Sequence, residues 1–140
     1  MLIDFHCHIL PGIDDGSKDA AMSAKMLKME RESGIEKIVL TPHFYLYEKS
    51  VDKFLEDRAG AYEQIEHIAE DLGIELKLGA EVLYTSSLAE QDLSKLCIQG
   101  TNYMLIELPY EKLGSRFINE FRSFIGNIYP DIVPSFDLIA

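Results

Sequence analysis

The chain has 140 residues and a formal net charge of −11, with 47% apolar and 26% charged residues. This length fits one domain that is large enough to bury a core. Its 13 lysines and arginines are scattered among 24 acidic residues, which argues against a nucleic-acid-binding surface. The sequence shows no apolar run of membrane-spanning length and no export signal. Cys7 and Cys97 lack the spacing of a disulfide framework and indicate reduced thiols. We therefore expect one cytoplasmic domain that does not insert into a membrane.

The hydrophobic pattern alternates between strand and helix periods along the chain. Strands are expected at residues 2–5, 35–40, 74–78 and 103–108. Helices are expected between residues 17 and 34, 50 and 73, 88 and 97, and 115 and 125. This order is typical of right-handed crossover connections and a parallel sheet, so we predict an α/β fold.

The first expected helix has clear end signals. Ser17 is a plausible N-cap, and Gly34 fits the position that follows a helix. Met22, Met26 and Met29 recur on one face, which predicts that they pack in the core.

The most informative stretch is the opening strand with His6, Cys7 and His8 at its end. Successive side chains on a strand alternate between faces, so both histidines should point one way and Cys7 the other. Two neighbouring imidazoles followed by the acidic pair Asp14 and Asp15 are typical of half a metal site.

Further metal-competent side chains follow the later strands. In an α/β barrel the active site is built from the C-terminal ends of the strands. Five such side chains therefore converge in the prediction: His6, His8, His43, Glu81 and Glu107. Imidazole and carboxylate ligands without thiolate suit Mn, Fe or Zn, and several carboxylates beside several histidines indicate more than one ion.

These motifs together resemble one family. The matching segments are Ile3–Gly16, Thr41-Pro42-His43, Gly79-Ala80-Glu81 and Leu105–Pro109. They are similar to the manganese-dependent protein-tyrosine phosphatases of the polymerase-and-histidinol-phosphatase (PHP) superfamily, which are associated with bacterial capsule and exopolysaccharide synthesis. The resemblance runs from Met1 to about Gly126 and implies a distorted α/β barrel of PHP type.

The resemblance also implies roles for individual residues. His6 and His8 match ligands of a first ion, His43 matches a ligand of a second ion, and Glu81 and Glu107 match carboxylate ligands. Asp15 is expected to lie nearest the metals, ahead of Asp14, and Asp15 and His43 are expected to take part in catalysis. The implied cofactor is Mn²⁺, with Fe or Zn as alternatives, in two or three ions. The implied substrate is a phosphotyrosine-bearing protein, in particular the tail of a bacterial tyrosine kinase.

The last part of the sequence departs from the family. Relatives continue with a His-Pro-Glu-Arg segment and an Asp-x-His pair, whereas residues 127–140 read as an atypical tail in which Pro130 and Pro134 interrupt an expected strand. A complete barrel needs roughly 250 residues. We therefore expect one truncated or frame-shifted domain over residues 1–140, with about the first four to five β/α units. The alternative is local substitution by Asp131 or Asp137 and completion of the barrel by a partner chain.

The sequence leaves three functions open. The first is metal-dependent hydrolysis of phosphotyrosine. Histidinol-phosphate phosphatase is a rival within the superfamily, while the acidic balance disfavours an exonuclease. The third is a catalytically inactive metal-binding remnant. An uncovered edge at the fourth strand makes self-association an expectation in every case.

Overall fold

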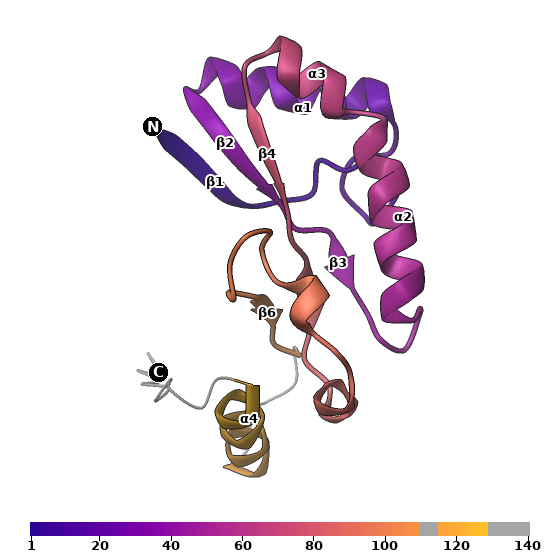
Figure 1. Cartoon of the computed structure of the whole chain (residues 1–140), viewed down its shortest axis with the longest axis vertical. Helices are drawn as coiled ribbons and strands as arrows, with labels where there is room; N and C mark the ends of the chain where they lie inside the picture. Colours follow the sequence, from indigo (N-terminus) through magenta and orange to yellow (C-terminus); the bar gives the residue numbers. More distant parts are fainter. Residues whose placement is uncertain (110–114, 129–140) are drawn as a thin grey trace.

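The computed structural model describes residues 1–109 and 115–128, and their strands form two three-stranded sheets in which every pairing is parallel (Figure 1). The first sheet has the order β1 (Leu2–Cys7), β2 (Ile35–Leu40) and β4 (Glu75–Leu78). The second has the order β3 (His43–Phe44), β5 (Glu81–Leu83) and β6 (Leu105–Glu107). The α/β class and the parallel pairing are confirmed, but the single sheet that the sequence suggested is divided in two.

Helices cover these sheets. They are α1 (Ala20–Glu32), α2 (Val51–Glu63), α3 (Glu66–Asp71) and α4 (Ser115–Ile128). Figure 1 shows α1 and α3 together beside the first sheet, and α4 at the other end of the molecule. Leu27 of α1 and Ala69 of α3 pack in one core cluster with Ile38 of β2, whereas Phe121 and Phe124 of α4 pack in a second cluster.

Two neighbouring stretches of chain are interrupted side by side, and this divides the sheet. Residues 41–42 separate β2 from β3, and residues 79–80 separate β4 from β5. Pro42 has no N–H to donate, so it cannot continue the ladder, although its carbonyl accepts the N–H of Glu81 at 3.0 Å. A Cβ on Gly79 would lie 3.3 Å from Val39 and 3.4 Å from Thr41, so the break is closely packed. As a result His43 and Glu81 begin the second sheet as direct partners.

Several predicted elements need correction. The N-cap of α1 is Asp19, whose side chain accepts the N–H of Met22, and Ser17 is instead buried with its hydroxyl 2.7 Å from that of Ser23. The helix predicted between residues 50 and 73 breaks into α2 and α3, although Ser50 caps α2 as its position suggested. Residues 88–97 form no α-helix but fall in two 3-10 turns, η1 (Ser86–Glu90) and η2 (Ser94–Leu96).

The prediction that the three methionines of α1 pack in the core is also wrong. Met22 and Met29 are exposed, the latter at 65%, while Ser23 and Leu27 are the buried residues of the helix. The helix is therefore rotated so that Met26 alone of the three packs partly against the core. Gly34 has a φ of +86° directly after the helix end, as its predicted role requires.

In the described part of the chain the edge strands are β1 and β4 in the first sheet and β3 and β6 in the second. The edge position of β6 agrees with the expectation for the fourth strand, and Phe5 on β1 is 60% exposed. Self-association along these edges stays a prediction. Asp131, Asp137 and most of the predicted tail lie outside the described residues. No helix in the described part of the chain is both long and apolar enough to cross a membrane.

Candidate metal centre

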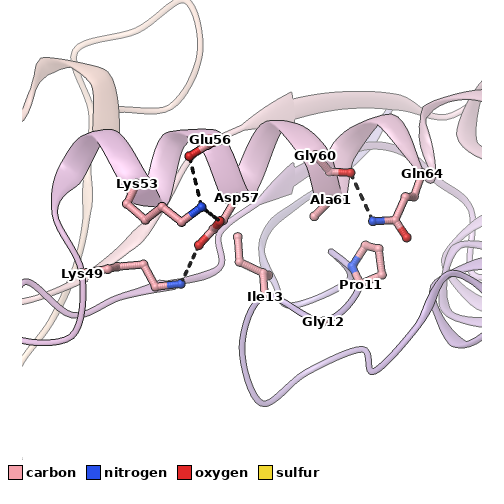
Figure 2. A pocket seen from close by; sticks show the side chains of 10 residues that line it. All are labelled: Pro11, Gly12, Ile13, Lys49, Lys53, Glu56, Asp57, Gly60, Ala61 and Gln64. Atoms are coloured by element: carbon pink, nitrogen blue, oxygen red, sulfur yellow. Dashed lines mark hydrogen bonds and ion pairs between the residues drawn. The ribbon is translucent and has the colours of Figure 1, made fainter.

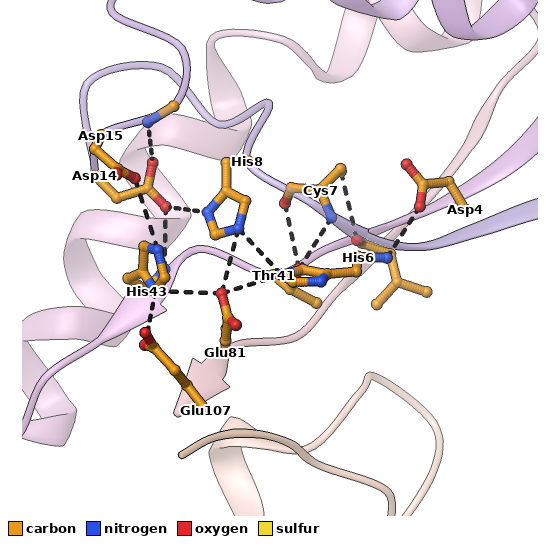
Figure 3. Close-up of polar contacts among 12 residues, drawn as sticks. Asp4, His6, Cys7, His8, Asp14, Asp15, Thr41, His43, Glu81 and Glu107 are labelled. Carbon is orange, nitrogen blue, oxygen red and sulfur yellow. Dashed lines mark hydrogen bonds and ion pairs between the residues drawn. The ribbon is translucent and has the colours of Figure 1, made fainter. Parts of the chain in front are cut away.

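The two histidines of the opening strand converge as predicted. Their Nε2 atoms lie 3.1 Å apart, at the point where an irregularity between Asp4 and Cys7 shifts the register of β1 on β2 (Figure 3). Cys7 points away into the core, where its thiol donates to the carbonyl of Val39 at 3.5 Å. Burial, with a smaller contribution from Asp4, raises the pKa of the Cys7 thiol to about 12. Cys7 is therefore a neutral packing residue.

His8 is held in one orientation by the acidic loop. Its Nδ1 donates to Asp14 at 2.8 Å, and the Asp14 side chain is only 4% exposed. That hydrogen bond raises the pKa of His8 more than burial lowers it. Burial acts to raise the pKa of Asp14, but hydrogen bonds from His8 and from the N–H groups of Gly16 and His43 outweigh it and lower the pKa. With its proton fixed on Nδ1, neutral His8 presents the lone pair of Nε2 to the cluster.

Gly16 is required by the close approach of this loop to β1. A Cβ there would overlap the carbonyl oxygen and Cβ of His8. The backbone N–H of Ser17 donates to the same carbonyl at 3.0 Å. The loop therefore packs on the backbone of His8 while its carboxylate holds the ring.

Glu81 lies at the centre of the cluster (Figure 3). Its Oε2 is 3.0 Å from Nε2 of His6, 3.3 Å from Nε2 of His8 and 3.2 Å from Nδ1 of His43. A carboxylate oxygen facing the lone pair of His8 is unfavourable without a cation between them. The arrangement therefore calls for a proton or a metal ion at this point.

A second convergence lies between His43 and Glu107. The atoms concerned, Nδ1 and Oε2, are 3.2 Å apart, yet both are buried and neither has a hydrogen-bond partner of suitable geometry in the described structure. Buried polar atoms are almost always satisfied. A nitrogen and an oxygen that face each other without a hydrogen bond are placed as two ligand atoms of one cation would be.

Asp15 approaches the cluster from the solvent side. Its Oδ1 is 3.7 Å from Nε2 of His43, and its side chain is 85% exposed. The structure thus separates the two aspartates: Asp14 orients His8 and Asp15 is free to turn toward an ion.

The ligand atoms form three overlapping groups in which every atom lies within 4.8 Å of the others. The groups are His6–His8–Glu81, His8–Asp15–His43 and His43–Glu81–Glu107. All six residues predicted as ligands are therefore brought together. The chemistry of the groups fits divalent cations with oxygen and nitrogen ligands, and their shared members fit more than one ion.

Sequence reasoning missed two supporting residues. Arg58 is buried and donates to the carbonyls of Gly79 at 2.6 Å and Lys95 at 3.2 Å. Thr41 is buried too, and its hydroxyl accepts the N–H of Cys7 at 3.1 Å. Both fix backbone beside the cluster. Arg58 belongs to no sequence pattern that signals this role, and the Thr41-Pro42-His43 segment does not reveal that the hydroxyl of its first residue holds the opening strand.

A groove of about 560 Å³ lies between the turn at residues 11–13 and α2 (Figure 2). Lys49 and Lys53 line it, and each is 3.0 Å from a carboxylate oxygen of Asp57. Lys53 also lies 3.1 Å from Glu56. Because their charges are balanced by these partners, the lysines do not form a separate phosphate site.

A parallel α/β scaffold with a histidine and carboxylate cluster at its strand ends is typical of metal-dependent hydrolases. Residues 2–133 match the family of capsular polysaccharide synthesis proteins CpsB/CapC, and the chain therefore belongs to that family. The resemblance seen in the sequence is thereby confirmed.

Named relatives give the same result. The chain is 35% identical over 117 residues to the tyrosine-protein phosphatase YwqE of Bacillus subtilis, an alignment that covers 79% of this chain and 44% of the relative. It is 34% identical over 111 residues to the tyrosine-protein phosphatase CpsB of Streptococcus pneumoniae, covering 76% and 44%. A solved structure from work on YwqE and CpsB, described as unique metal-dependent tyrosine phosphatases, superposes with a TM-score of 0.66 at 30% identity and covers 88% of this chain and 51% of that one. The chain thus spans about half the length of the relatives it matches.

Proposed function

We propose that this chain carries the metal centre of a metal-dependent protein-tyrosine phosphatase that acts in capsule or exopolysaccharide synthesis. The observation that supports this most is the meeting of Glu81 with three imidazoles beside the orphaned pair His43 and Glu107. The names of the relatives supply the reaction and its substrate class. The PHP-type barrel and a cytoplasmic location belong to the same proposal.

The proposed ligands are those of the three groups: His6, His8, Asp15, His43, Glu81 and Glu107. Mn²⁺ is the proposed ion, since imidazole and carboxylate ligands suit it, and Fe and Zn are the alternatives. We expect two or three ions because the groups share His8, His43 and Glu81.

Bound divalent ions would lower the pKa of a bound water, so that it could act as a nucleophile at neutral pH. Their positive charge would also offset the negative charge of the phosphate. The chain's own residues prepare that site. Asp14 keeps His8 in the tautomer that exposes Nε2, and Asp15 at the rim accepts a hydrogen bond from a water or takes a ligand position. Asp15 and His43 are thus the proposed catalytic pair. Cys7 is excluded as a nucleophile by its burial and raised pKa.

The proposed substrate is a phosphotyrosine on another protein, in particular the tail of a bacterial tyrosine kinase. The net charge of −11 would repel a phosphate ester from an apo site. Substrate binding is therefore expected to depend on metal loading.

The test is hydrolysis of a phosphotyrosine peptide by the purified chain with and without Mn²⁺. Histidinol phosphate is assayed in parallel, and the His6→Ala/His8→Ala variant is compared with His67→Ala, an exposed histidine on α3. We expect manganese-dependent release of phosphate from the peptide, lost in the double variant and kept in His67→Ala. A folded chain that binds metal but releases no phosphate would instead identify a metal-binding remnant, and faster turnover of histidinol phosphate would favour that substrate.

A further inference from the structure

A ladder of aromatic rings leads from the metal centre to the surface. The rings of His43 and Tyr45 are stacked at 5.2 Å and 25°, and those of Tyr45 and Tyr47 at 5.6 Å and 6°. These separations are typical of offset stacking. Exposure rises along the ladder, from 17% for the His43 side chain to 70% for Tyr47.

The ladder runs from a short strand into a turn. Phe44 is fully buried, and Leu46 packs partly against the same core cluster. β3 ends at Phe44, and the residues that follow form a turn in which the N–H of Glu48 donates to the carbonyl of Tyr45 at 2.9 Å. This turn places the rings of Tyr45 and Tyr47 in one stacked series with the ring of His43. Neither tyrosine belongs to the described core clusters, so the fold does not account for two stacked rings at this position.

Tyr45 stacks with both His43 and Tyr47, whereas Tyr47 ends the series and is 70% exposed. An exposed ring at the end of such a series can accept another aromatic ring. Aromatic side chains on exposed surfaces recognise ligands through such contacts at low entropic cost, because a ring has only two side-chain torsions. In an aryl phosphate the ring is one oxygen away from phosphorus, whereas an alkyl phosphate such as phosphoserine has no ring. A phosphate bound beside His43 would place a substrate ring at the tyrosine ladder.

We infer that Tyr45 and Tyr47 form a platform that stacks on the aromatic ring of the substrate and selects phosphotyrosine over phosphoserine. This inference rests on the proposed function and adds the residues that determine its specificity. The site's carboxylates provide no such discrimination, because they respond only to charge.

The test measures binding without turnover. The Mn²⁺-loaded chain is titrated calorimetrically with two peptides that differ only in carrying a phosphonate analogue of phosphotyrosine or of phosphoserine. We expect the wild-type chain to bind the aromatic analogue about tenfold more tightly. The Tyr45→Leu/Tyr47→Leu variant should lose this preference and keep its affinity for the phosphoserine analogue, which also shows that the site is still folded.

Two controls separate ring stacking from other effects. Tyr45→Phe/Tyr47→Phe keeps the rings and should keep the preference. Tyr103→Leu removes an exposed tyrosine elsewhere and should also keep it.

The outcomes distinguish the two proposals. A tenfold preference that survives the double leucine change, or equal binding of both peptides by the wild type, overturns the platform. Phosphotyrosine hydrolysis without the preference leaves the proposed function standing and rejects the platform alone. A tyrosine-dependent preference without hydrolysis supports the platform and rejects turnover by this chain, and failure to bind either peptide rejects both.

Discussion

The surroundings of His8 hold its ring in one tautomer and one orientation, as the proposed role of a metal ligand requires. Asp14 accepts a hydrogen bond from the Nδ1–H of His8, and Gly16 allows the loop to pack on the backbone of His8. Hydrogen-bonded partners of this kind set the tautomer and raise the basicity of a metal-binding histidine.

Replacing Asp14 with Asn should therefore weaken Mn²⁺ binding by about ten- to a hundredfold without removing a ligand. The loss of charge should also lower the pKa of His8 toward its ordinary value, since Asp14 is what raises it. Protons then compete less, so the pH at which metal binding is lost should move down. Calorimetric titration with Mn²⁺ across pH measures both effects.

The exposed Asp71→Asn change on α3 is a matched control for that experiment. Unchanged affinity in Asp14→Asn would show that His8 needs no orienting carboxylate.

Cys7 should be chemically inert in the folded chain. With a pKa of about 12, only about one thiol in ten thousand is ionised at pH 8. In a Cys97→Ser background, a disulfide reagent should react with Cys7 about a thousandfold more slowly in the native chain than in urea, where the thiol regains its ordinary pKa. Equal rates in both states would mean that Cys7 is accessible to solvent and that its side chain does not point from β1 into the core.

At the scale of elements, Arg58 joins α2 to the break between β4 and β5. Its guanidinium lies 5.4 Å from the centre of the Phe54 ring and donates to the Gly79 carbonyl at 2.6 Å. Glu81 begins β5 only two residues after that carbonyl. By holding the Gly79 carbonyl, the arginine therefore helps to fix the backbone that positions the Glu81 carboxylate.

The Arg58→Met change should lower the free energy of unfolding by about 2–4 kcal/mol, because it leaves the buried carbonyl of Gly79 and the partly buried carbonyl of Lys95 without their donor. It should also weaken Mn²⁺ binding through Glu81. Urea unfolding and metal titration test the two consequences, with the exposed Arg31→Met on α1 as the control. If stability fell while metal binding stayed at the wild-type value, Arg58 would serve the core alone.

Sequence periodicity located most of the long elements and failed at the short ones. The strands β3 and β5 have two and three residues, too few for a period to be visible, and the sheet break depends on contacts of Pro42 and Gly79 across strands. Ser17 and Asp19 are both suitable N-cap residues by type, and the buried hydrogen bond between the hydroxyls of Ser17 and Ser23 leaves the cap to Asp19. The face of α1 was misjudged because the buried hydrogen bonds of Ser23 with Ser17 and with the carbonyl of Ile9 turn Ser23 and Leu27 toward the core.

The convergence of the candidate ligands could be predicted because parallel strands deliver their C-terminal ends to one edge. That rule places His6, His8, His43, Glu81 and Glu107 together without any knowledge of side-chain contacts. It does not reveal which aspartate orients a histidine, since Asp14 and Asp15 are adjacent in sequence and differ only in the direction that the loop gives them. The tyrosine ladder was missed for the same reason.

At the scale of the whole molecule, charge and topology point to the same requirement. The chain carries a net charge of −11 and gathers four carboxylates around its histidines, those of Asp14, Asp15, Glu81 and Glu107. Such a site repels phosphate until cations reverse the local sign. Metal binding is therefore the central claim, and the phosphatase proposal depends on it.

The measurement that tests this claim most directly is a Mn²⁺ titration of the chain, followed by the electron paramagnetic resonance signal of the free ion. The wild-type chain should remove Mn²⁺ from solution, and Glu81→Gln, which keeps the shape but removes the central charge, should bind at least about a hundredfold more weakly. The exposed Glu90→Gln on η1 should bind as the wild type does. Mn²⁺ that stays free in the presence of the wild-type chain, or that binds Glu81→Gln equally well, would contradict the metal centre described here.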